Sequence, residues 1–354
     1  MKPMPLREYL ADPCPEPSFD SGTARHLITR SPLHAWYQHP RLNPVPTDEE
    51  HGAALDVGGA CHAMLLEDDE SRFAIVEADE WRTKAAREAR DQAHADGRIP
   101  LLARQMDPIR AIVGQSRLAI NRCDELKDVF HDAIREQVCL WQDDGAWCRA
   151  RPDCVSADGD IVLNYKTTAA SAEPDGFGSG MLIRELYHLQ AYHHARGLWR
   201  EAGSSGNLPK CLWLIQEVEP PYAASILGAS PALTALAEAQ WEHALALWRQ
   251  CLAEARWPAY PSRVCWIEPA AWHADKWCSR HDVSAKAYQA AMQLQSPINE
   301  ADHAAQRQAE AAEFDALVAK GLPSPSNVTL LITLQAQREA RNAELTPVTA
   351  QAGK

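Results

Sequence analysis

Residues 151–168 read RPDCVSADGDIVLNYKTT, and this stretch decides the fold. Two apolar runs flank Asp158-Gly159, a dipeptide typical of the tight turn between antiparallel strands. We therefore expect one strand over 147–155 and a second over 161–166. The sequence thus predicts a pair of neighbouring strands at the centre of the chain.

Strands and helices alternate on both sides of this pair, which indicates an α/β fold with a mixed central sheet flanked by helices. The expected neighbours are a strand over 136–141 with a turn at 143–145, a helix over 182–199, a buried strand over 211–215 and a helix that Ser230-Pro231 begins and Pro258 ends. Upstream, the sequence predicts helices over 56–66, 81–90 and 107–122.

The composition divides the chain into two parts. We expect one domain over residues 1–270, with a helical N-terminal part at 1–130 and the sheet core at 131–270. After residue 270 the sequence is rich in Ala, Gln and Glu, which predicts a helical C-terminal extension over 271–354. The role of this extension is open; oligomer contacts are one possibility.

The bulk composition excludes several classes of protein. A net charge of −13 argues against a general polyanion binder, although a local basic groove is compatible with it. The ten cysteines form no CxxC pair, so we expect reduced thiols and no iron–sulfur cluster. The N-terminus does not resemble a signal peptide, and no apolar run approaches the ~18 residues of a membrane span. We expect a soluble, cytoplasmic protein without a membrane partner.

Three residues of the central pair suggest a divalent-metal site. Asn164 and Lys166 are two apart in one expected strand, so their side chains point to the same face. Asp153 lies near the end of the neighbouring strand. A carboxylate beside a carboxylate-x-Lys sequence typically holds Mg²⁺ for phosphodiester hydrolysis. The alternative for Asp153 is an ordinary turn residue after Pro152.

The sequence RPD followed by NYKTT resembles the RPD…(D/E)xKTT signature of RecE-like phage exonucleases, which belong to the PD-(D/E)xK (RecB-like) nuclease superfamily. Three further motifs agree in order, and together they cover roughly residues 25 to 270. They are residues 58–67, which resemble a GxxxHxxxLE helix with His62 at the ligand position; Glu136 and Trp141, which match an REQ…W segment; and residues 189–192, which resemble a helix bearing a conserved Gln, here Gln190.

This resemblance implies a PD-(D/E)xK, restriction-endonuclease-like core and a function. The implied activity is Mg²⁺-dependent 5′-to-3′ digestion of linear double-stranded DNA, with Mn²⁺ as a possible substitute. The 3′ single strands would pass to a single-strand annealing protein for recombination. The implied assembly is a ring-shaped homo-oligomer, a trimer or a tetramer, that encircles DNA.

The same resemblance implies roles for individual residues. His62, Asp153, residue 164 and the backbone carbonyl of Tyr165 would hold the metal. Lys166 would assist the attacking water. Gln190 would position Lys166 or the phosphate.

Asn164 stands where the family has a metal-binding carboxylate, which should weaken Mg²⁺ binding and activity. A degenerate natural copy would show several eroded motif positions, whereas Asp153, Lys166, His62 and Gln190 all remain. We hypothesise a deliberate Asp-to-Asn substitution, of the kind that traps a nuclease on uncut DNA. Natural inactivation is the alternative, and the codon in the source gene decides between them.

Several alternatives stay open at this point. His62 could be a buried structural histidine, and Glu136 could bind a second metal or simply pair with a cation. The cations of the helix at 81–90 could contact phosphate or form a solvated face; they are Arg82, Lys84, Arg87 and Arg90. His193 and His194 are expected on a helix surface, and the family often has Tyr at the position of His194.

Two other functions also fit the sequence. One is a DNA-end-binding recombination module without catalysis, inactivated at Asn164. The other is a structure-specific endonuclease on the same core, which would cut covalently closed circles that an exonuclease cannot enter.

Overall fold

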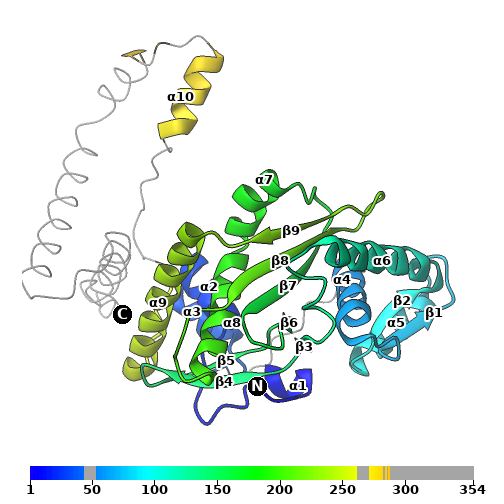
Figure 1. Ribbon diagram of the computed structural model, residues 1–354, viewed down its shortest axis with the longest axis horizontal. Coiled ribbons are helices and arrows are strands. Elements are labelled where there is room, and N and C mark those ends of the chain that lie inside the picture. Colours follow the sequence, from blue (N-terminus) through cyan, green and yellow to red (C-terminus); the bar gives the residue numbers. More distant parts are fainter. Residues whose placement is uncertain (44–52, 261–270, 282–283, 285, 288–354) are drawn as a thin grey trace, which may run out of the picture. The chain divides into compact units, whose positions relative to one another are not determined.

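The computed structural model describes residues 1–43, 53–260, 271–281, 284 and 286–287 (Figure 1). The chain divides into two compact units, Met1–Trp257 and Pro258–Lys354, and each is described by itself. The expected boundary at residue 270 and most of the expected C-terminal extension lie outside the described residues. None of the helices in the described ranges is long and apolar enough to cross a membrane.

A five-stranded mixed sheet forms the centre of the first unit, as the sequence predicted. Its order is β3–β6–β7–β8–β9. The strands are β3 (Ile134–Arg135), β6 (Cys154–Val155), β7 (Ile161–Thr168), β8 (Lys210–Glu217) and β9 (Ala224–Gly228). β7 and β8 are parallel and the other pairs are antiparallel. Parallel neighbours need a crossover connection, and the helix α8 (Tyr187–Glu201) provides it.

Helices cover both faces of this sheet (Figure 1). α8 and α9 (Pro231–Glu254) enclose a core on one side, to which β7 contributes Val162. α4 (Ala53–His62) and α6 (Met106–Arg122) enclose a core on the other side, to which β7 contributes Leu163 and Tyr165. This alternation along β7 is the pattern of a strand buried on both faces.

The expected return strand over 147–155 is wrong as a single element. It splits into β5 (Ala146–Ala150), which pairs with β4 (Cys139–Asp143) in a separate two-stranded sheet, and β6 in the central sheet. The break falls at residues 151–153 because Pro152 has no N–H to donate to a strand ladder. Asp144 and Gly145 both have positive φ, as the predicted turn between β4 and β5 requires.

The N-terminal part is not wholly helical. Two four-residue strands, β1 (Phe73–Val76) and β2 (Ile99–Leu102), pair in parallel. α5 (Lys84–Ala95) connects them. The other N-terminal elements are the helices α1 (Leu6–Leu10), α2 (Ser21–Thr29) and α3 (Pro32–Gln38), the π-helix η1 (Ala63–Glu67) and the 3₁₀ helix η2 (Ala103–Gln105).

The helix predicted over 182–199 begins later, at Tyr187. The glycine-rich segment before it forms a short helix, α7 (Pro174–Gly176), and a π-helix, η3 (Phe177–Leu182). Gly178 and Gly180 have open space around their Cα atoms, so the π-helix is not forced by close packing at these positions.

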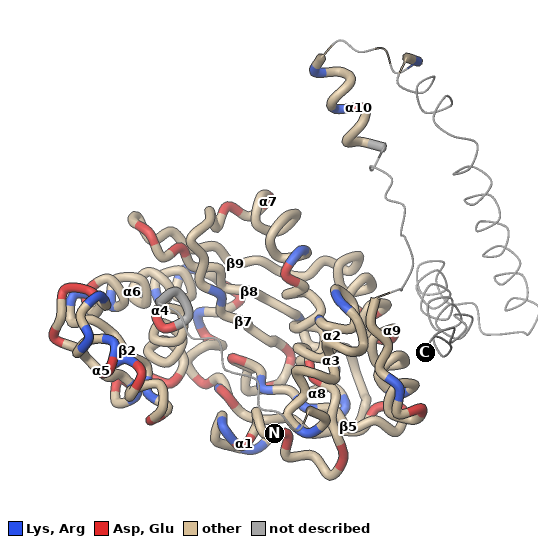
Figure 2. The backbone as a smooth tube through the Cα atoms, turned by 180° about the vertical axis from the view of Figure 1, so that it is seen from behind, with Lys and Arg blue, Asp and Glu red and all other residues tan. Residues whose placement is uncertain are grey.

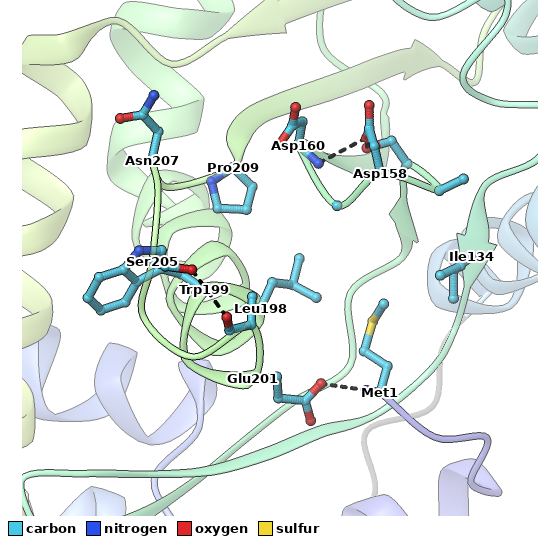
Figure 3. Close-up of a pocket in the computed structure, with 14 residues that line it drawn as sticks. Met1, Ile134, Asp158, Asp160, Leu198, Trp199, Glu201, Ser205, Asn207 and Pro209 are labelled. Atoms are coloured by element: carbon cyan, nitrogen blue, oxygen red, sulfur yellow. Dashed lines mark hydrogen bonds and ion pairs between the residues drawn. The ribbon is translucent and has the colours of Figure 1, made fainter.

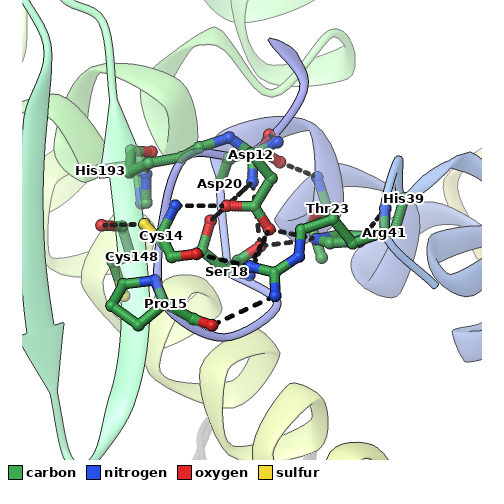
Figure 4. A network of polar contacts seen from close by, with 11 residues as sticks. Asp12, Cys14, Pro15, Ser18, Asp20, Thr23, His39, Arg41, Cys148 and His193 are labelled. Carbon is green, nitrogen blue, oxygen red and sulfur yellow. Dashed lines mark hydrogen bonds and ion pairs between the residues drawn. The ribbon is translucent and has the colours of Figure 1, made fainter. Parts of the chain in front are cut away.

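A buried polar network fixes the N-terminal segment to β5 (Figure 4). The Arg149 guanidinium is almost fully buried, donates to Ser18 Oγ at 2.7 Å and pairs with Asp20 Oδ2 at 2.5 Å. Asp12 accepts from the Ser18 hydroxyl and backbone N–H. Because a buried charge is tolerated only when it is paired, this network ties residues 12–20 to the strand that leads into Asp153.

The expectation that His193 and His194 lie on a helix surface is wrong. Both are buried, because α8 packs against the sheet on one side and against α2 and α9 on the other. Trp241 donates its indole N–H to His193 Nδ1 at 2.9 Å, so the His193 proton lies on Nε2, which donates to the Arg149 carbonyl at 2.8 Å. Burial lowers the pKa of His193 to about 4, despite the opposing effect of that carbonyl.

We predict that His193 makes the protein acid-sensitive. Its folded pKa of about 4 lies below the ordinary value of 6.5, so the unfolded chain takes up a proton first and stability falls as the pH drops from 6.5 toward 4. This group contributes a loss of about 3 kcal/mol over that range. Chemical denaturation at several pH values measures the free energy of unfolding, which should fall less between pH 6.5 and 4 in His193→Gln than in the unaltered chain. The exposed His131→Gln serves as the control, and an equal fall in His193→Gln and the unaltered chain would contradict the assignment.

Candidate metal centre

Three side chains form one row across the strands β3, β6 and β7. The register of β6 with β7, continued by one residue, puts Asp153 opposite Asn164. The register of β3 with β6, continued in the same way, puts Glu136 opposite Asp153, and the Glu136 N–H donates to the Asp153 carbonyl at 3.3 Å. Directly opposed residues of antiparallel strands lie side by side, so the pairing puts Asp153 between Asn164 and Glu136.

The row lies where β7 extends beyond β6. The Asp153 carboxylate takes the place of a strand partner there, because its Oδ2 accepts from the Tyr165 N–H at 2.8 Å. The N–H and C=O of one residue in a strand point to the same edge. The Tyr165 carbonyl therefore points toward this edge as well, and the motif resemblance implies that it is a metal ligand.

His62 reaches the row from the last turn of α4. Its Nε2 lies 3.3 Å from Glu136 Oε1 and 3.6 Å from Asp153 Oδ1. α4 approaches β7 closely, since a Cβ on Gly58 would lie 3.0 Å from Thr167 Oγ1. The π-helix η1 begins directly after His62, and such short π-helical segments are frequent at functional sites.

These residues fit a metal ion. One ligand atom from each of His62, Glu136 and Asp153 lies within 4.8 Å of the others. Glu136 Oε1 and Asn164 Oδ1 are buried and have no hydrogen-bond partner among the described residues. Both oxygens are acceptors without a hydrogen bond, although His62 Nε2 forms an ion pair with Glu136 Oε1. A divalent cation bound by carboxylate oxygens and one imidazole would satisfy such a set.

Burial and their neighbours shift the pKa values of the two carboxylates in opposite directions. Burial, together with the negative charge of Asp153, raises the pKa of Glu136 to about 7, against the effects of His62 and Arg151. Burial opposes ionisation of Asp153, but Lys166 and His62 together hold its pKa far below the ordinary value. Burial would lower the pKa of His62, yet the two carboxylates outweigh it and raise that pKa. Two buried carboxylates thus share a few cationic neighbours, and an added divalent ion would relieve their repulsion.

Glu136 is the residue that sequence reasoning left undecided. The structure places it inside the cluster and also pairs its Oε2 with Arg151 at 2.6 Å. Its φ of 55° lies in the left-handed region, which few residues other than glycine occupy. That backbone strain is not visible in sequence, but it is typical of a residue held in place by its surroundings.

Lys166 lies beside the row, as predicted. Its Nζ is 4.0 Å from Asp153 Oδ2 and 5.4 Å from the ring centroid of Tyr187, a cation–π contact. Asn164 is fully buried, and its Nδ2 donates a long hydrogen bond of 3.4 Å to the Leu212 carbonyl. Tyr187 was not singled out from the sequence, because only the fold brings the start of α8 to β7.

α8 carries two further residues of the expected site. Gln190 is half-buried, and in the described structure its side chain forms no hydrogen bond to Lys166. His194 is buried near the cluster. Burial lowers its pKa to about 3, and the charges of Asp153 and Lys166 also act on it.

The expected DNA-binding cations do not form an unpaired patch. Arg82 pairs with Glu80 at 3.3 Å, Lys84 with Glu88 at 3.6 Å and Arg90 with Asp91 at 2.8 Å. Figure 2 shows basic and acidic residues interleaved around α5. Only Arg87 among the four has no ion pair within the described residues.

A pocket of about 450 Å³ lies apart from the cluster (Figure 3). It is lined by the turn at residues 157–160, by Trp199 and Glu201 at the end of α8, and by Pro209 before β8. These residues surround the start of β7, whereas the cluster lies beside Asn164 and Tyr165, further along this strand. The pocket contains none of His62, Glu136 and Asp153, so its size does not identify the functional site.

We predict that Glu136 is a metal ligand and not only a partner of Arg151. Glu136→Gln keeps the size of the side chain and removes one of two carboxylates, so Mn²⁺ affinity measured by calorimetry should fall roughly tenfold or more. Asp158→Asn, which alters an acidic residue of the distant pocket, should leave the affinity unchanged. Equal affinities in the wild type and Glu136→Gln would assign Glu136 to the ion pair alone.

Comparisons with known proteins agree with the fold. No protein-family model and no curated protein matches the sequence. A crystal structure of a protein from Eubacterium rectale, provisionally named an exonuclease, matches with a TM-score of 0.51 and 10% sequence identity over 76% of this chain and 97% of that chain. At this identity the likeness concerns the fold alone. The chain therefore shares its mixed α/β architecture with a protein named as a nuclease.

Proposed function

We propose that this chain is a metal-dependent nuclease that digests linear double-stranded DNA from its ends. The observation that carries the proposal is the row of Glu136, Asp153 and Asn164, which is flanked by His62 from α4 and by Lys166 from β7. Carboxylates and an imidazole around a cation site, with a lysine beside them, are suited to phosphodiester hydrolysis. The motif resemblance and the shared fold support the same activity.

The metal would be held by His62, Glu136, Asp153 and the Tyr165 carbonyl, with Mg²⁺ or Mn²⁺ as the ion. A bound divalent ion supplies two effects in such reactions: it polarises the phosphate and lowers the pKa of a water. The protein's own part is to fix the ligands. The Tyr165 N–H orients the Asp153 carboxylate, and Arg151 orients Glu136.

Lys166 is the group that would act on the scissile phosphate. The Asp153 carboxylate and the Tyr187 ring hold its ammonium on the side of the row. An ammonium fixed there can stabilise the negative charge that develops on the phosphate oxygens and can donate a hydrogen bond to the attacking water. Gln190 on the adjacent helix would contact the same phosphate.

Asn164 is the element that weakens the site. An amide oxygen can coordinate a cation, but it carries no negative charge, so the row has two carboxylates in place of three. The Asn164 Nδ2 donates to the Leu212 carbonyl, which a carboxylate could not do. We infer that an Asp at this position would be unfavourable without a metal and favourable with one.

We also propose that digestion runs 5′ to 3′ and that the resulting 3′ single strand passes to an annealing protein. The proposed assembly is a ring-shaped trimer or tetramer around DNA. Of the α5 cations, Arg87 is the one best suited to a phosphate contact, because carboxylates already neutralise the other three.

We predict that Asn164→Asp raises nuclease activity about 10²-fold or more, since a missing charged group at a reacting centre costs on that order. The assay uses linear duplex DNA labelled at the 5′ end of one strand, with Mg²⁺ or Mn²⁺. Release of the labelled nucleotide first indicates 5′-to-3′ digestion. Thermal unfolding should also show a larger stabilisation by Mn²⁺ in the Asp form than in the Asn form.

Two controls separate the alternatives. The double variant Asn164→Asp/Lys166→Ala should bind metal yet stay inactive. Activity in this variant would come from a contaminating nuclease and not from the site. Covalently closed circular DNA should remain intact with every form. If the Asp form is inert on linear DNA but binds its ends, the protein is an end-binding module; if it cuts closed circles, it is an endonuclease.

A further inference from the structure

The second unit contains a helix with an unusual distribution of side chains. α10 (Ala271–Arg280) is followed by the turn residue His281. At 3.6 residues per turn, all of its aromatic and basic residues fall within about half of the helix circumference. They are Trp272, His273, Lys276, Trp277, Arg280 and His281. We call this set the α10 aromatic-basic face.

The two sides of α10 differ in burial. The indoles of Trp272 and Trp277 are 61% and 55% exposed, which is unusual for large apolar rings. On the opposite side, Cys278 is buried and Ala274 is half-buried. The small residues of α10 are therefore the ones that pack, and the exposed tryptophans do not serve as core residues.

Each indole is paired with an imidazole one turn or less away. The Trp272 and His273 ring centroids lie 3.8 Å apart, and those of Trp277 and His281 lie 4.8 Å apart with the rings inclined by 23°. These contacts restrict the rotation of the indoles while leaving them exposed. Flat rings held in this way cost little entropy when another flat ring stacks on them.

The chemistry of the face favours one kind of partner. Lys276 and Arg280 lie between the indoles and beside them, so planar stacking surfaces alternate with positive charges. The indoles are roughly 7.5 Å apart along the helix axis, about twice the ~3.4 Å separation of stacked bases, so each can receive a different base. Base stacking on aromatic rings combined with cations for the backbone is how proteins bind single strands without sequence preference.

We propose that α10 is a binding surface for single-stranded nucleic acid. Bases stack on Trp272 and Trp277, and Lys276 and Arg280 neutralise phosphates. Duplex DNA is a poor ligand for this face because its bases are already stacked on one another. In a chain of net charge −13, a local set of cations is needed to hold a polyanion. Binding at this surface requires no catalysis, so this proposal can be tested separately from the proposed nuclease activity.

The test is fluorescence anisotropy of a labelled dT oligonucleotide with the full chain in EDTA, over a series of salt concentrations. Trp272→Ala and Trp277→Ala should each weaken binding roughly tenfold. Lys276→Gln/Arg280→Gln should reduce the slope of log K against log salt by about 1.4, since each cation contributes about 0.7 for a single strand. Affinity for the matching duplex, which the first unit is proposed to bind, should be the same in the unaltered chain and in the two tryptophan variants.

Two control variants use residues of the first unit. Tyr37→Ala removes an exposed aromatic ring, and Arg110→Gln removes an exposed cation; neither should change the affinity or the salt slope. Circular dichroism should show that all variants are folded. Unchanged oligonucleotide binding in both tryptophan variants would overturn the proposal, and so would a wild type that binds anionic vesicles but not the oligonucleotide.

Discussion

One hydrogen bond organises the site: the Asp153 carboxylate accepts from the Tyr165 N–H at 2.8 Å. It exists because Pro152 interrupts strand pairing, so that the chain leaves the β4–β5 hairpin after Ala150 and β6 begins in the central sheet. A side chain then occupies the place where backbone pairing would continue along β7. Asp153 is thereby fixed opposite Asn164 and beside Glu136, and His62 closes the cluster from α4. The geometry follows from the strand register and from Pro152, which has no backbone N–H to donate to a neighbouring strand.

The same arrangement explains why the cluster suits a cation. Burial, together with the charge of Asp153, raises the pKa of Glu136, while Lys166 and His62 keep Asp153 ionised. Buried acceptors without hydrogen bonds are costly, so Glu136 Oε1 and Asn164 Oδ1 at one edge of the sheet fit a bound cation. Compared with an Asp at this position, Asn164 removes one negative charge from this edge and keeps nearly the same side-chain shape.

Local pattern was enough to predict much of this. The apolar run that begins at Ile161, the Asp144-Gly145 turn and the Ser230-Pro231 start of α9 are short-range signals. The motif spacing led us to expect His62, Asp153 and Lys166 in one site. Other features depend on distant packing. The strands of 73–76 and 99–102 are too short to distinguish by period, His193 is buried because α8 is covered on both sides, and the role of Glu136 depends on which strand lies next to β3. The split at Pro152 could have been inferred from its missing N–H.

The most direct test of the central claim is a crystal structure of the protein soaked with Mn²⁺, with anomalous data collected to locate the ion. The account predicts one strong anomalous peak within coordination distance of His62 Nε2, Glu136 Oε1 and Asp153 Oδ1. It would be contradicted if that position stayed empty at saturating Mn²⁺ while His62 still bridged the two carboxylates, because the row would then be an ion-pair network and not a metal centre.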